Sequence, residues 1–339
     1  MDRIKVGQIG ICHEHAAGKM NTLRLRPDVF EVVGVVDDRA TMSAKFAGDD
    51  LGPYDGLPWL TEEELFAVPG LQAVLVEVPN QDLVPTAARC LERRLPIHMD
   101  KPGGEDLSAF ERMRRGYEAL RLPFQMGYMF RGNPAMHWIL EAARKGYFGE
   151  IHGIRADMSH NYGGDAYQDY IGRFAGGVMF NLGCHLLDWI IALMGRPAGV
   201  APFLKSTPEQ PDRVKNNTLA VLEYPHALAT VDVCSRQAGH RRLKVCGARG
   251  TAELCPQEDF SGQPLRLELL LVEGNDEFAA GSHTVDFGET RDRYEEHLLE
   301  WARMVRGEIP NPHDARHDCL VQEVLLAASG YAKWEFMPT

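Results

Sequence analysis

The chain has 339 residues, 45% of them hydrophobic, and its 48 acidic and 36 basic side chains give a formal net charge of −12. This length and apolar content predict two globular domains, and the negative charge argues against nucleic acid or a membrane surface as partners. Because no stretch of about eighteen apolar residues and no apolar leader occurs, we expect a cytoplasmic protein. The seven cysteines are widely spaced and form no C-x-x-C pair, so we expect reduced thiols.

The first 125 residues alternate short apolar runs with helical patterns, which is typical of a parallel sheet covered by helices. The expected strands are 4–9, 30–36, 73–78 and 97–99. The expected helices are 16–25, 42–46 (extending to about 49), 61–66, 83–93 and 107–120. Thr61 and Glu64 have the spacing of a capping box at the start of the third of these helices.

From residue 126 onward, helical stretches are few and β-rich tracts dominate. Helices are expected at 135–145 and 184–193, and strands at 151–159, 218–224, 227–235, 243–246, 251–254 and 265–272. Turn residues between these tracts predict one open, largely antiparallel sheet, which can leave one face exposed. Amphipathic helices are expected at 294–305 and 319–328, and the second could pack back on the N-terminal half.

A dinucleotide-binding turn would follow the first strand. Gly10 fits the first glycine of G-x-G-x-x-G, but Cys12 and His15 occupy the other two glycine positions. Free amides at the helix start, with His13 or His15 when protonated, would attract phosphates, although Glu14 places a carboxylate nearby. The alternative is a strand-to-helix turn that binds no ligand.

Two acids end the second strand. Asp37 stands where an acid would bind the adenine-ribose hydroxyls, and Asp37 with Asp38 favours NAD over NADP because a 2′-phosphate would meet both carboxylates. The adjacent Arg39 could soften that preference. Ordinary Asp-Asp turn chemistry is the alternative.

Short motifs occur in a consistent order over nearly the whole chain. They are VLVEVPN at 74–80, MDKP at 99–102, YMFRGNP at 128–134, GEI at 149–151, GGVMFNLGCHLLD at 176–188 and GARGTAEL at 247–254. In this order they resemble the glucose-fructose oxidoreductase and inositol 2-dehydrogenase (Gfo/Idh/MocA) family. The resemblance implies an α/β protein with an N-terminal Rossmann domain (1–125) and a C-terminal α+β domain (126–339) whose large, mostly antiparallel open sheet often makes oligomer contacts. We therefore expect a homodimer or homotetramer.

The resemblance also implies hydride transfer between a nicotinamide cofactor, here NAD, and a secondary alcohol of a sugar, inositol or related polyol. The cofactor-binding positions are then Gly10, Ile11, Cys12, His13, His15, Asp37, Asp38, Pro79, Asn80, Asp100 and Lys101. The catalytic positions carried over from the family are Lys101, Asn181 and His185. The substrate-binding positions are Tyr128, Arg131, His160, Asn161, Tyr162, Asn181 and His185.

Oxidation of a secondary alcohol needs a base for the hydroxyl proton, and histidine suits this task at neutral pH. We expect His185 in the first turn of an apolar helix, where the helix dipole favours the neutral ring. Lys101 could orient the hydroxyl and stabilise charge on its oxygen, or relay the proton. The alternatives are a histidine packed in the core and an ordinary loop lysine.

Three positions depart from the family or fall outside its site. Asn181 replaces the family's usual aspartate, and because an amide cannot accept a proton, proton transfer is expected to depend on His185. Asp188 is expected to brace the helix. Glu77 stands where the family has a small residue and would oppose phosphate binding unless it is protonated or paired with a cation.

Two further patterns leave alternatives open. The 159–165 loop carries the aromatic and amide groups that polyol binding needs, but it could be an ordinary solvated loop. His313 and His317 could chelate a metal if helical, although a charged helix start is the simpler interpretation, and we expect no metal in the site. The alternative functions are an NAD-dependent glycoside-cleaving enzyme and a non-catalytic nucleotide- or sugar-binding sensor.

Overall fold

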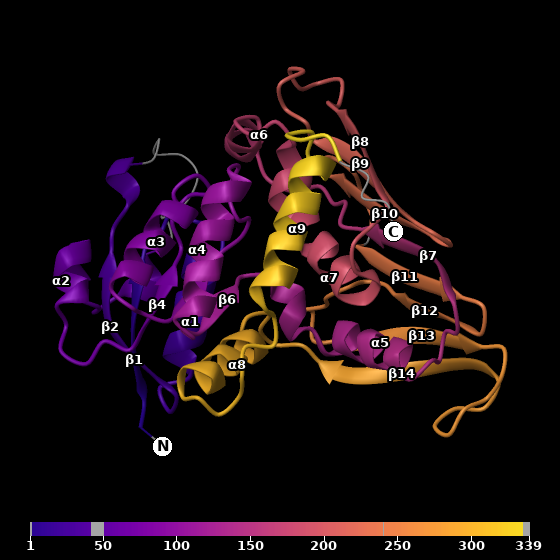
Figure 1. Cartoon of the computed structure of the whole chain (residues 1–339), viewed down its shortest axis with the longest axis horizontal. Coiled ribbons are helices and arrows are strands. Elements are labelled where there is room, and N and C mark those ends of the chain that lie inside the picture. Colours follow the sequence, from indigo (N-terminus) through magenta and orange to yellow (C-terminus); the bar gives the residue numbers. More distant parts are fainter. Residues whose placement is uncertain (1, 42–50, 240, 335–339) are drawn as a thin grey trace. The chain divides into compact units, whose positions relative to one another are not determined.

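The computed structural model describes residues 2–41, 51–239 and 241–334. It divides into two compact units, the first made of Met1–Tyr128 with Tyr294–Gln322 and the second of Met129–Arg293 with Glu323–Thr339 (Figure 1). The first unit thus gains a C-terminal segment that the predicted domain limits, 1–125 and 126–339, did not include. The helix expected at 42–49 lies outside the described residues.

The first unit is built on a six-stranded parallel sheet in the order β3-β2-β1-β4-β5-β6. The strands are β1 (Ile4–Ile9), β2 (Phe30–Val36), β3 (Trp59–Leu60), β4 (Ala73–Val76), β5 (Ile97–Met99) and β6 (Phe124–Met126). This order is that of the Rossmann fold, which confirms the fold predicted for this half. β3 and β6 were not predicted.

Helices pack against this sheet. They are α1 (Ala16–Leu25), α2 (Glu62–Phe66), α3 (Leu83–Glu92), α4 (Leu107–Ala119), α8 (Glu295–Val305) and the first part of α9 (Ala315–Ala328), with 3-10 turns at Arg39–Thr41 and Gly52–Tyr54. α1 and α8 share one apolar cluster with β1 and β2, in which Trp301 stacks on Phe30. The capping box before α2 is confirmed, since Glu64 N donates to Thr61 Oγ1 (3.2 Å) and Thr61 N to Glu64 Oε2 (2.8 Å).

The second unit is built on an eight-stranded sheet in the order β14-β13-β12-β11-β7-β10-β9-β8. The strands are β7 (Ile151–Asp157), β8 (Gly199–Lys205), β9 (Asn217–Tyr224), β10 (Ala227–Cys234), β11 (Arg242–Gly247), β12 (Gly250–Leu254), β13 (Pro264–Leu271) and β14 (Gly281–Glu289). Only β7 and β10 pair in parallel, so the predicted open, mostly antiparallel sheet is confirmed. The edge strands β8 and β14 were missed; Pro202 interrupts the apolar run of β8, polar residues alternate along β14, and no residue in either strand is fully buried.

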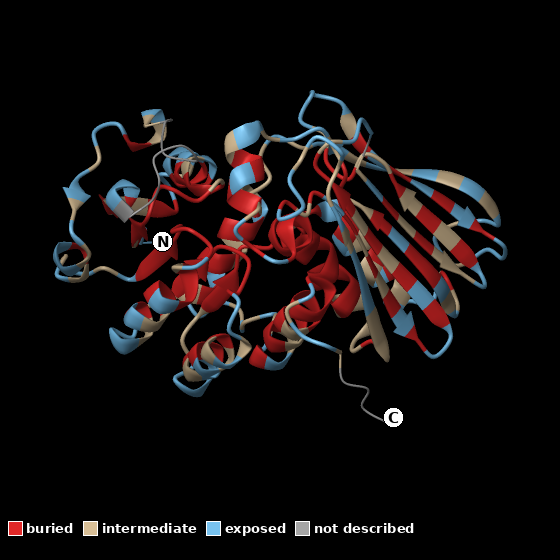
Figure 2. Ribbon diagram, turned by 90° about the horizontal axis from the view of Figure 1, so that it is seen from above, coloured by how far each residue is buried: buried red, intermediate tan, exposed pale blue. Residues whose placement is uncertain are grey.

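One face of this sheet is covered and the other is open. The second unit's helical segments are a 3-10 turn at Met129–Gly132, α5 (Pro134–Arg144), α6 (Asp165–Ile171), a π-helical turn at Met179–Gly183, α7 (Cys184–Met194) and the end of α9. α5 contacts β13, and α7 contacts β7 and β10. Buried and exposed residues alternate along β13, and Figure 2 shows stripes of buried and exposed residues on strands of the large sheet.

Two predictions about the whole chain can be checked directly. All seven cysteines are free thiols, as predicted. Among the described residues, none of the helices has both the length and the apolar character needed to cross a bilayer.

Candidate active site

Lys101 follows β5 in the first unit, and its side chain is completely buried. Three contacts hold it, each at a different atom. Its backbone N–H donates to Asp100 Oδ1 (2.7 Å), its carbonyl oxygen lies 3.2 Å from His13 Nε2, and its Nζ lies 2.7 Å from Glu14 Oε1. The residues after β1 and the end of β5 therefore fix this lysine together.

A buried cluster of charged groups surrounds Asp100. Asp100 Oδ2 lies 2.6 Å from Lys19 Nζ, 3.0 Å from His13 Nδ1 and 3.1 Å from His15 Nδ1. Burial opposes ionisation of Asp100, but His13, Lys19 and His15 together lower its pKa well below the usual range. Asp100 is therefore the anion on which this cluster is organised.

Glu77, after β4, is the second acid of the cluster. It is fully buried, and its Oε1 lies 2.8 Å from Lys19 Nζ. Burial raises the pKa of Glu77 well above its usual value, although Lys19 opposes the shift. The sequence had left open whether Glu77 is protonated or paired with a cation; the structure places the Lys19 ammonium group beside it, while the raised pKa favours the protonated acid.

Lys19 is the site residue that sequence reasoning missed. It lies on α1 among the buried residues of that helix, between Ala16 and Met20. A lysine at a buried position of a helix is unusual unless an acid pairs with it, so its place on that face was the available signal. Its partners Glu77 and Asp100 are 58 and 81 residues away in sequence.

Two groups next to Lys101 have pKa values far from their usual ones. Burial would raise the pKa of Glu14, but Lys101, His15 and His13 lower it to about 2. Burial lowers the pKa of His15 to about 4, against the opposing effect of Asp100. At neutral pH Glu14 is therefore a carboxylate and His15 is a neutral ring.

In the described part of the chain, one group has the donor set for a metal ion, formed by His13, His15 and Asp100 with ligand atoms within 4.8 Å of one another. Lys19 Nζ already lies 2.6 Å from Asp100 Oδ2 and supplies the positive charge at this carboxylate. A divalent ion there would be repelled by this ammonium group. His313 and His317, whose rings are 5.0 Å apart at the start of α9, do not belong to such a group among the described residues.

The turn after β1 has the backbone of a nucleotide-binding turn. Gly10 has φ +91°, and a Cβ there would lie 2.7 Å from the Glu77 backbone, so a glycine is needed. Ile11 N and Cys12 N donate to Asp38 Oδ1 (2.8 and 3.1 Å). These two amides of the turn therefore already have an acceptor, a carboxylate of the chain itself.

The two acids after β2 have different surroundings. Asp38 is buried against the turn, whereas Asp37 faces solvent and forms an ion pair with Arg39. Hydrogen bonds from Arg39 lower the pKa of Asp37. The strand order, the left-handed glycine and an acid beside the turn all fit the ribose end of a dinucleotide. Asn80, after β4, is also buried in this unit.

In the second unit, His185 is completely buried and its ring lies 5.9 Å from that of Phe130. His185 is the second residue of α7 (Cys184–Met194), so it lies in the first turn of that helix, as predicted. The π-helical turn Met179–Gly183 runs directly into α7, so helical backbone precedes His185. The helix-dipole argument for a neutral ring therefore does not apply, because it requires a free helix N-terminus at this position.

The π-helical turn also carries Asn181, which is buried and donates from Nδ2 to Tyr167 Oη (3.0 Å). Single π-helical turns inside helices are frequent at functional sites. Nothing in the sequence indicated this turn or the pairing between the Asn181 amide and a phenol from α6. Asn181, which stands where the family has an aspartate, is thus hydrogen-bonded to the hydroxyl group of Tyr167.

Arg131 and Asp188 form a buried bidentate ion pair with distances of 3.0 and 2.6 Å. Asp188 therefore braces α7, as the sequence suggested, and it does so through Arg131. The predicted contact of Arg131 with a substrate stays a prediction, and this pair gives the guanidinium group a structural partner.

The 159–165 loop places its polar groups differently. His160 Nδ1 lies 2.9 Å from Met158 O, and burial lowers the pKa of His160. Tyr162 is 37% exposed, with its ring 4.8 Å from that of Tyr167, and Asn161 is exposed. Tyr128 belongs to the first unit, where it is buried.

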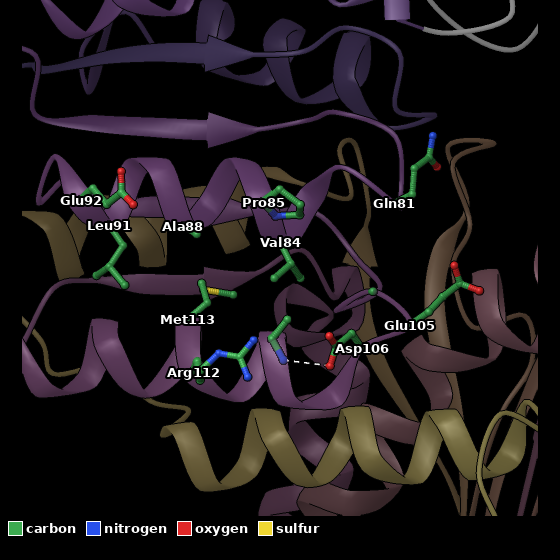
Figure 3. A pocket seen from close by; sticks show the side chains of 12 residues that line it. Gln81, Val84, Pro85, Ala88, Leu91, Glu92, Glu105, Asp106, Arg112 and Met113 are labelled. Carbon is green, nitrogen blue, oxygen red and sulfur yellow. Dashed lines mark hydrogen bonds between the residues drawn. The ribbon is translucent and has the colours of Figure 1, made fainter.

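The first unit also has a cavity of about 590 Å³ between α3 and α4 (Figure 3). Its lining residues are Gln81, Val84, Pro85, Ala88, Leu91, Glu92, Gly104, Glu105, Asp106, Ala109, Arg112 and Met113. None of the predicted site residues lines this cavity.

Comparison with known proteins gives a family assignment for part of the chain. Residues 137–253 match the model of the GFO/IDH/MocA C-terminal domain. This chain carries a Gfo/Idh/MocA C-terminal domain. The family resemblance predicted from the sequence motifs is confirmed.

Similar proteins match nearly the whole length of this chain. Oxidoreductase ORF334 of Rhizobium meliloti is 24% identical over 351 residues, covering 99% of each chain. The structure of an oxidoreductase from Agrobacterium radiobacter in complex with NAD+, L-tartaric acid and magnesium has a TM-score of 0.75 at 18% identity, covering 96% of this chain and 95% of that one. The 3-ketoreductase KijD10 from Actinomadura kijaniata, in a complex with TDP-benzene and NADP, has a TM-score of 0.76 at 16% identity, covering 99% and 100%. At these identities the structural likeness establishes the fold.

Proposed function

We propose that this protein is an NAD(P)-dependent oxidoreductase acting on a carbon that bears a hydroxyl group. The observation that carries the proposal is the buried Lys101 ammonium group, fixed 2.7 Å from Glu14 directly after β5 of a Rossmann-ordered sheet. Ligands of such sheets bind beyond the carboxyl ends of the strands. Lys101 therefore stands at the edge of the first unit where a nucleotide is expected.

A bound nicotinamide cofactor would accept or supply the hydride. The residues that would hold it are the turn Gly10–His15, the acids Asp37 and Asp38, and Pro79, Asn80, Asp100 and Lys101. Lys101 Nζ would donate a hydrogen bond to the oxygen of the reacting carbon and stabilise negative charge there. His185 would exchange the hydroxyl proton. Asn181, through Tyr167, would orient the substrate.

The substrate class that we propose is a sugar, inositol or related polyol. The support is the 159–165 loop, where His160, Asn161 and Tyr162 offer aromatic and amide groups next to Tyr167. The similar structures bound to L-tartaric acid or described as a 3-ketoreductase are consistent with chemistry at hydroxyl and keto carbons.

We further propose NAD as the preferred cofactor. Both acids after β2 would repel the 2′-phosphate of NADP. Arg39, the cation that could offset this repulsion, is engaged by Asp37. The preference should therefore be strong.

The test is a parallel titration with NADH and NADPH, followed by tryptophan fluorescence, after a denatured sample has been checked for retained nucleotide. We expect NADH to bind at least about tenfold more tightly, and the double variant Asp37→Asn/Asp38→Asn to reduce this difference. Binding of neither nucleotide, with none retained, would refute the proposed function. Equal binding of both would refute only the preference.

One observation favours a second candidate, a non-catalytic sensor. Asp38 accepts hydrogen bonds from the backbone amides of Ile11 and Cys12, which could otherwise bind a ligand. If Lys101→Ala binds nucleotide normally and neither protein turns over any polyol, the sensor is favoured. Loss of turnover in this variant alone supports the enzyme.

We also propose that the protein is a homodimer or homotetramer formed through its open sheet. The open face is apolar at β8 to β10, where Phe203 is 52% and Leu228 48% exposed and Phe203 pairs with Leu219. Exposed apolar patches of this kind commonly mark protein interfaces. Light scattering at micromolar concentration should give a dimer or tetramer, and Phe203→Glu should shift it toward monomer. A monomeric parent protein would contradict the proposal.

A further inference from the structure

The turn after β1 lacks the second and third glycines of a dinucleotide fingerprint, and three consecutive residues at its end, 13–15, have a common target. His13 Nε2 lies 3.2 Å from the Lys101 carbonyl oxygen, and Glu14 Oε1 lies 2.7 Å from Lys101 Nζ. His15, at the third glycine position, contacts Asp100, which accepts a hydrogen bond from the Lys101 N–H. The end of this imperfect turn therefore holds Lys101, directly through His13 and Glu14 and through Asp100 for His15.

The charges explain why Glu14 matters most among them. A buried ammonium group is strongly disfavoured unless a counterion pairs with it. Asp100 and Glu77 share Lys19, whereas Glu14 is the acid that forms the ion pair with Lys101. His15 Nε2 lies 3.7 Å from Glu14 Oε1, farther than Lys101 Nζ, so the histidine does not displace the lysine.

We propose that Glu14 is the positioning residue for Lys101: its carboxylate keeps the ammonium group protonated and in place, so that Lys101 donates a hydrogen bond to the substrate oxygen and does not accept its proton. The hydroxyl proton then passes to His185, while Lys101 retains its own three protons. The role of Lys101 toward the substrate rests on the proposed function. The stabilisation of its protonated form by Glu14 does not.

The test measures Lys101 itself, in the full chain without nucleotide or substrate. Protein labelled with 13C at lysine Cε is titrated by NMR, and Lys101→Arg assigns the Lys101 signal. We expect Glu14→Gln to lower the pH at which Lys101 loses its proton by at least one unit, a tenfold loss of proton affinity. The control is Glu277→Gln, which removes an exposed ion pair of the same 2.7 Å length with Lys145 and should leave the Lys101 signal unchanged. Identical Lys101 titrations in the parent protein and Glu14→Gln would overturn the proposal.

If Glu14→Gln does not fold, the reciprocal variant gives the same answer. In Lys101→Met the Glu14 carboxyl group should titrate well above the parent pKa of about 2, because its cation is gone. An unchanged Glu14 titration would again overturn the proposal. Nucleotide binding is measured separately, so a protein that binds no nucleotide can still show the Glu14 effect, and the two failures are distinct.

Once a substrate is known, a pH profile separates positioning from a merely structural role. Glu14→Gln should move the alkaline limb of kcat/KM to lower pH by at least one unit, and Glu14→Asp should restore part of the shift. A Glu14→Gln profile with the parent shape and a uniformly lower rate would contradict a role through Lys101.

Discussion

The two candidate groups for proton chemistry lie in opposite kinds of surroundings. In the first unit, Lys101 lies in a cluster where Lys19, Glu14, Glu77 and Asp100 are all buried and held by ion pairs. In the second unit, His185 lies in a helix whose neighbouring side chains are apolar, and Asn181 makes a neutral hydrogen bond. Charges define one site and packing defines the other.

This difference predicts how each region responds to change. In the charged cluster one carboxylate, Asp100, contacts several titratable groups, so removing one group alters the protonation of the others. In the helical segment the contacts are local, so a substitution should act on its own partner. The bidentate pair of Arg131 and Asp188 is the exception, because it is a buried ion pair in the otherwise neutral surroundings of α7.

The largest effect is expected from His185→Gln. Glutamine cannot accept the hydroxyl proton at neutral pH, so kcat for the substrate should fall about 100- to 10,000-fold, while NADH binding stays within twofold. Steady-state kinetics and fluorescence titration measure the two quantities. His226→Gln, on an exposed turn between β9 and β10, is the matched control. Turnover within a factor of two of the parent would show that His185 is only a core residue.

Arg131→Ala should give the largest loss of stability. Removing one partner of a buried pair leaves an uncompensated charge, so the free energy of unfolding should fall by about 3–5 kcal/mol. Urea denaturation measures this loss. The exposed pair of Arg266 and Asp286 offers a control, since Arg266→Ala should cost less than about 1 kcal/mol. If the two arginine variants lose the same stability, the buried pair does not brace α7.

His15→Asn should change the pH dependence of stability. The pKa of His15 is about 4 in the folded protein against 6.5 for the unfolded chain, so the unfolded state binds the extra proton between these values. Stability is therefore full above pH 6.5 and falls as the pH drops toward 4, by an amount on the order of 3 kcal/mol. Asparagine keeps a polar group and removes this titration, so the variant's curve should be flatter in that window.

The measurement is urea denaturation of both proteins across that pH range. Glu14 also has a lowered pKa, so its contribution is lost at still lower pH in both proteins, and the comparison rests on the difference between them. Parallel curves for the parent and His15→Asn would mean that the cluster does not set the protonation of His15.

The smallest effect is expected from Tyr167→Phe. The substitution removes the phenol oxygen that accepts from Asn181 Nδ2 and should lower the free energy of unfolding by about 1–2 kcal/mol. The NMR titration of Lys101 in the other unit should not move. A shifted Lys101 titration would show that the Asn181 segment is coupled to the Lys101 cluster, against the contrast between a neutral local site and a charged coupled one.

The sequence predicted the larger elements because their patterns are local. β1, β2, β5 and α1 begin and end at the predicted residues, and the capping box before α2 is present. β3 and β6 were missed although β5, as short as β6, was predicted, and β8 and β14 lie at sheet edges where burial is incomplete. α6 was missed because Gly163 and Gly164 precede it and, with its first residue Asp165, are typical of a loop.

The sequence by itself determined the fold class and the family resemblance, because short-range periodicity and motif order encode them, and the resemblance singled out Lys101, Asn181 and His185 as candidates. Only the tertiary structure showed that Lys19 contacts Glu77, that Arg131 pairs with Asp188, and that Glu14 pairs with Lys101. Glu14 and Lys101 are 87 positions apart in sequence. A charge pair at such a separation leaves no periodic pattern, because its partners meet only after the parallel strands align their carboxyl ends at one edge of the sheet.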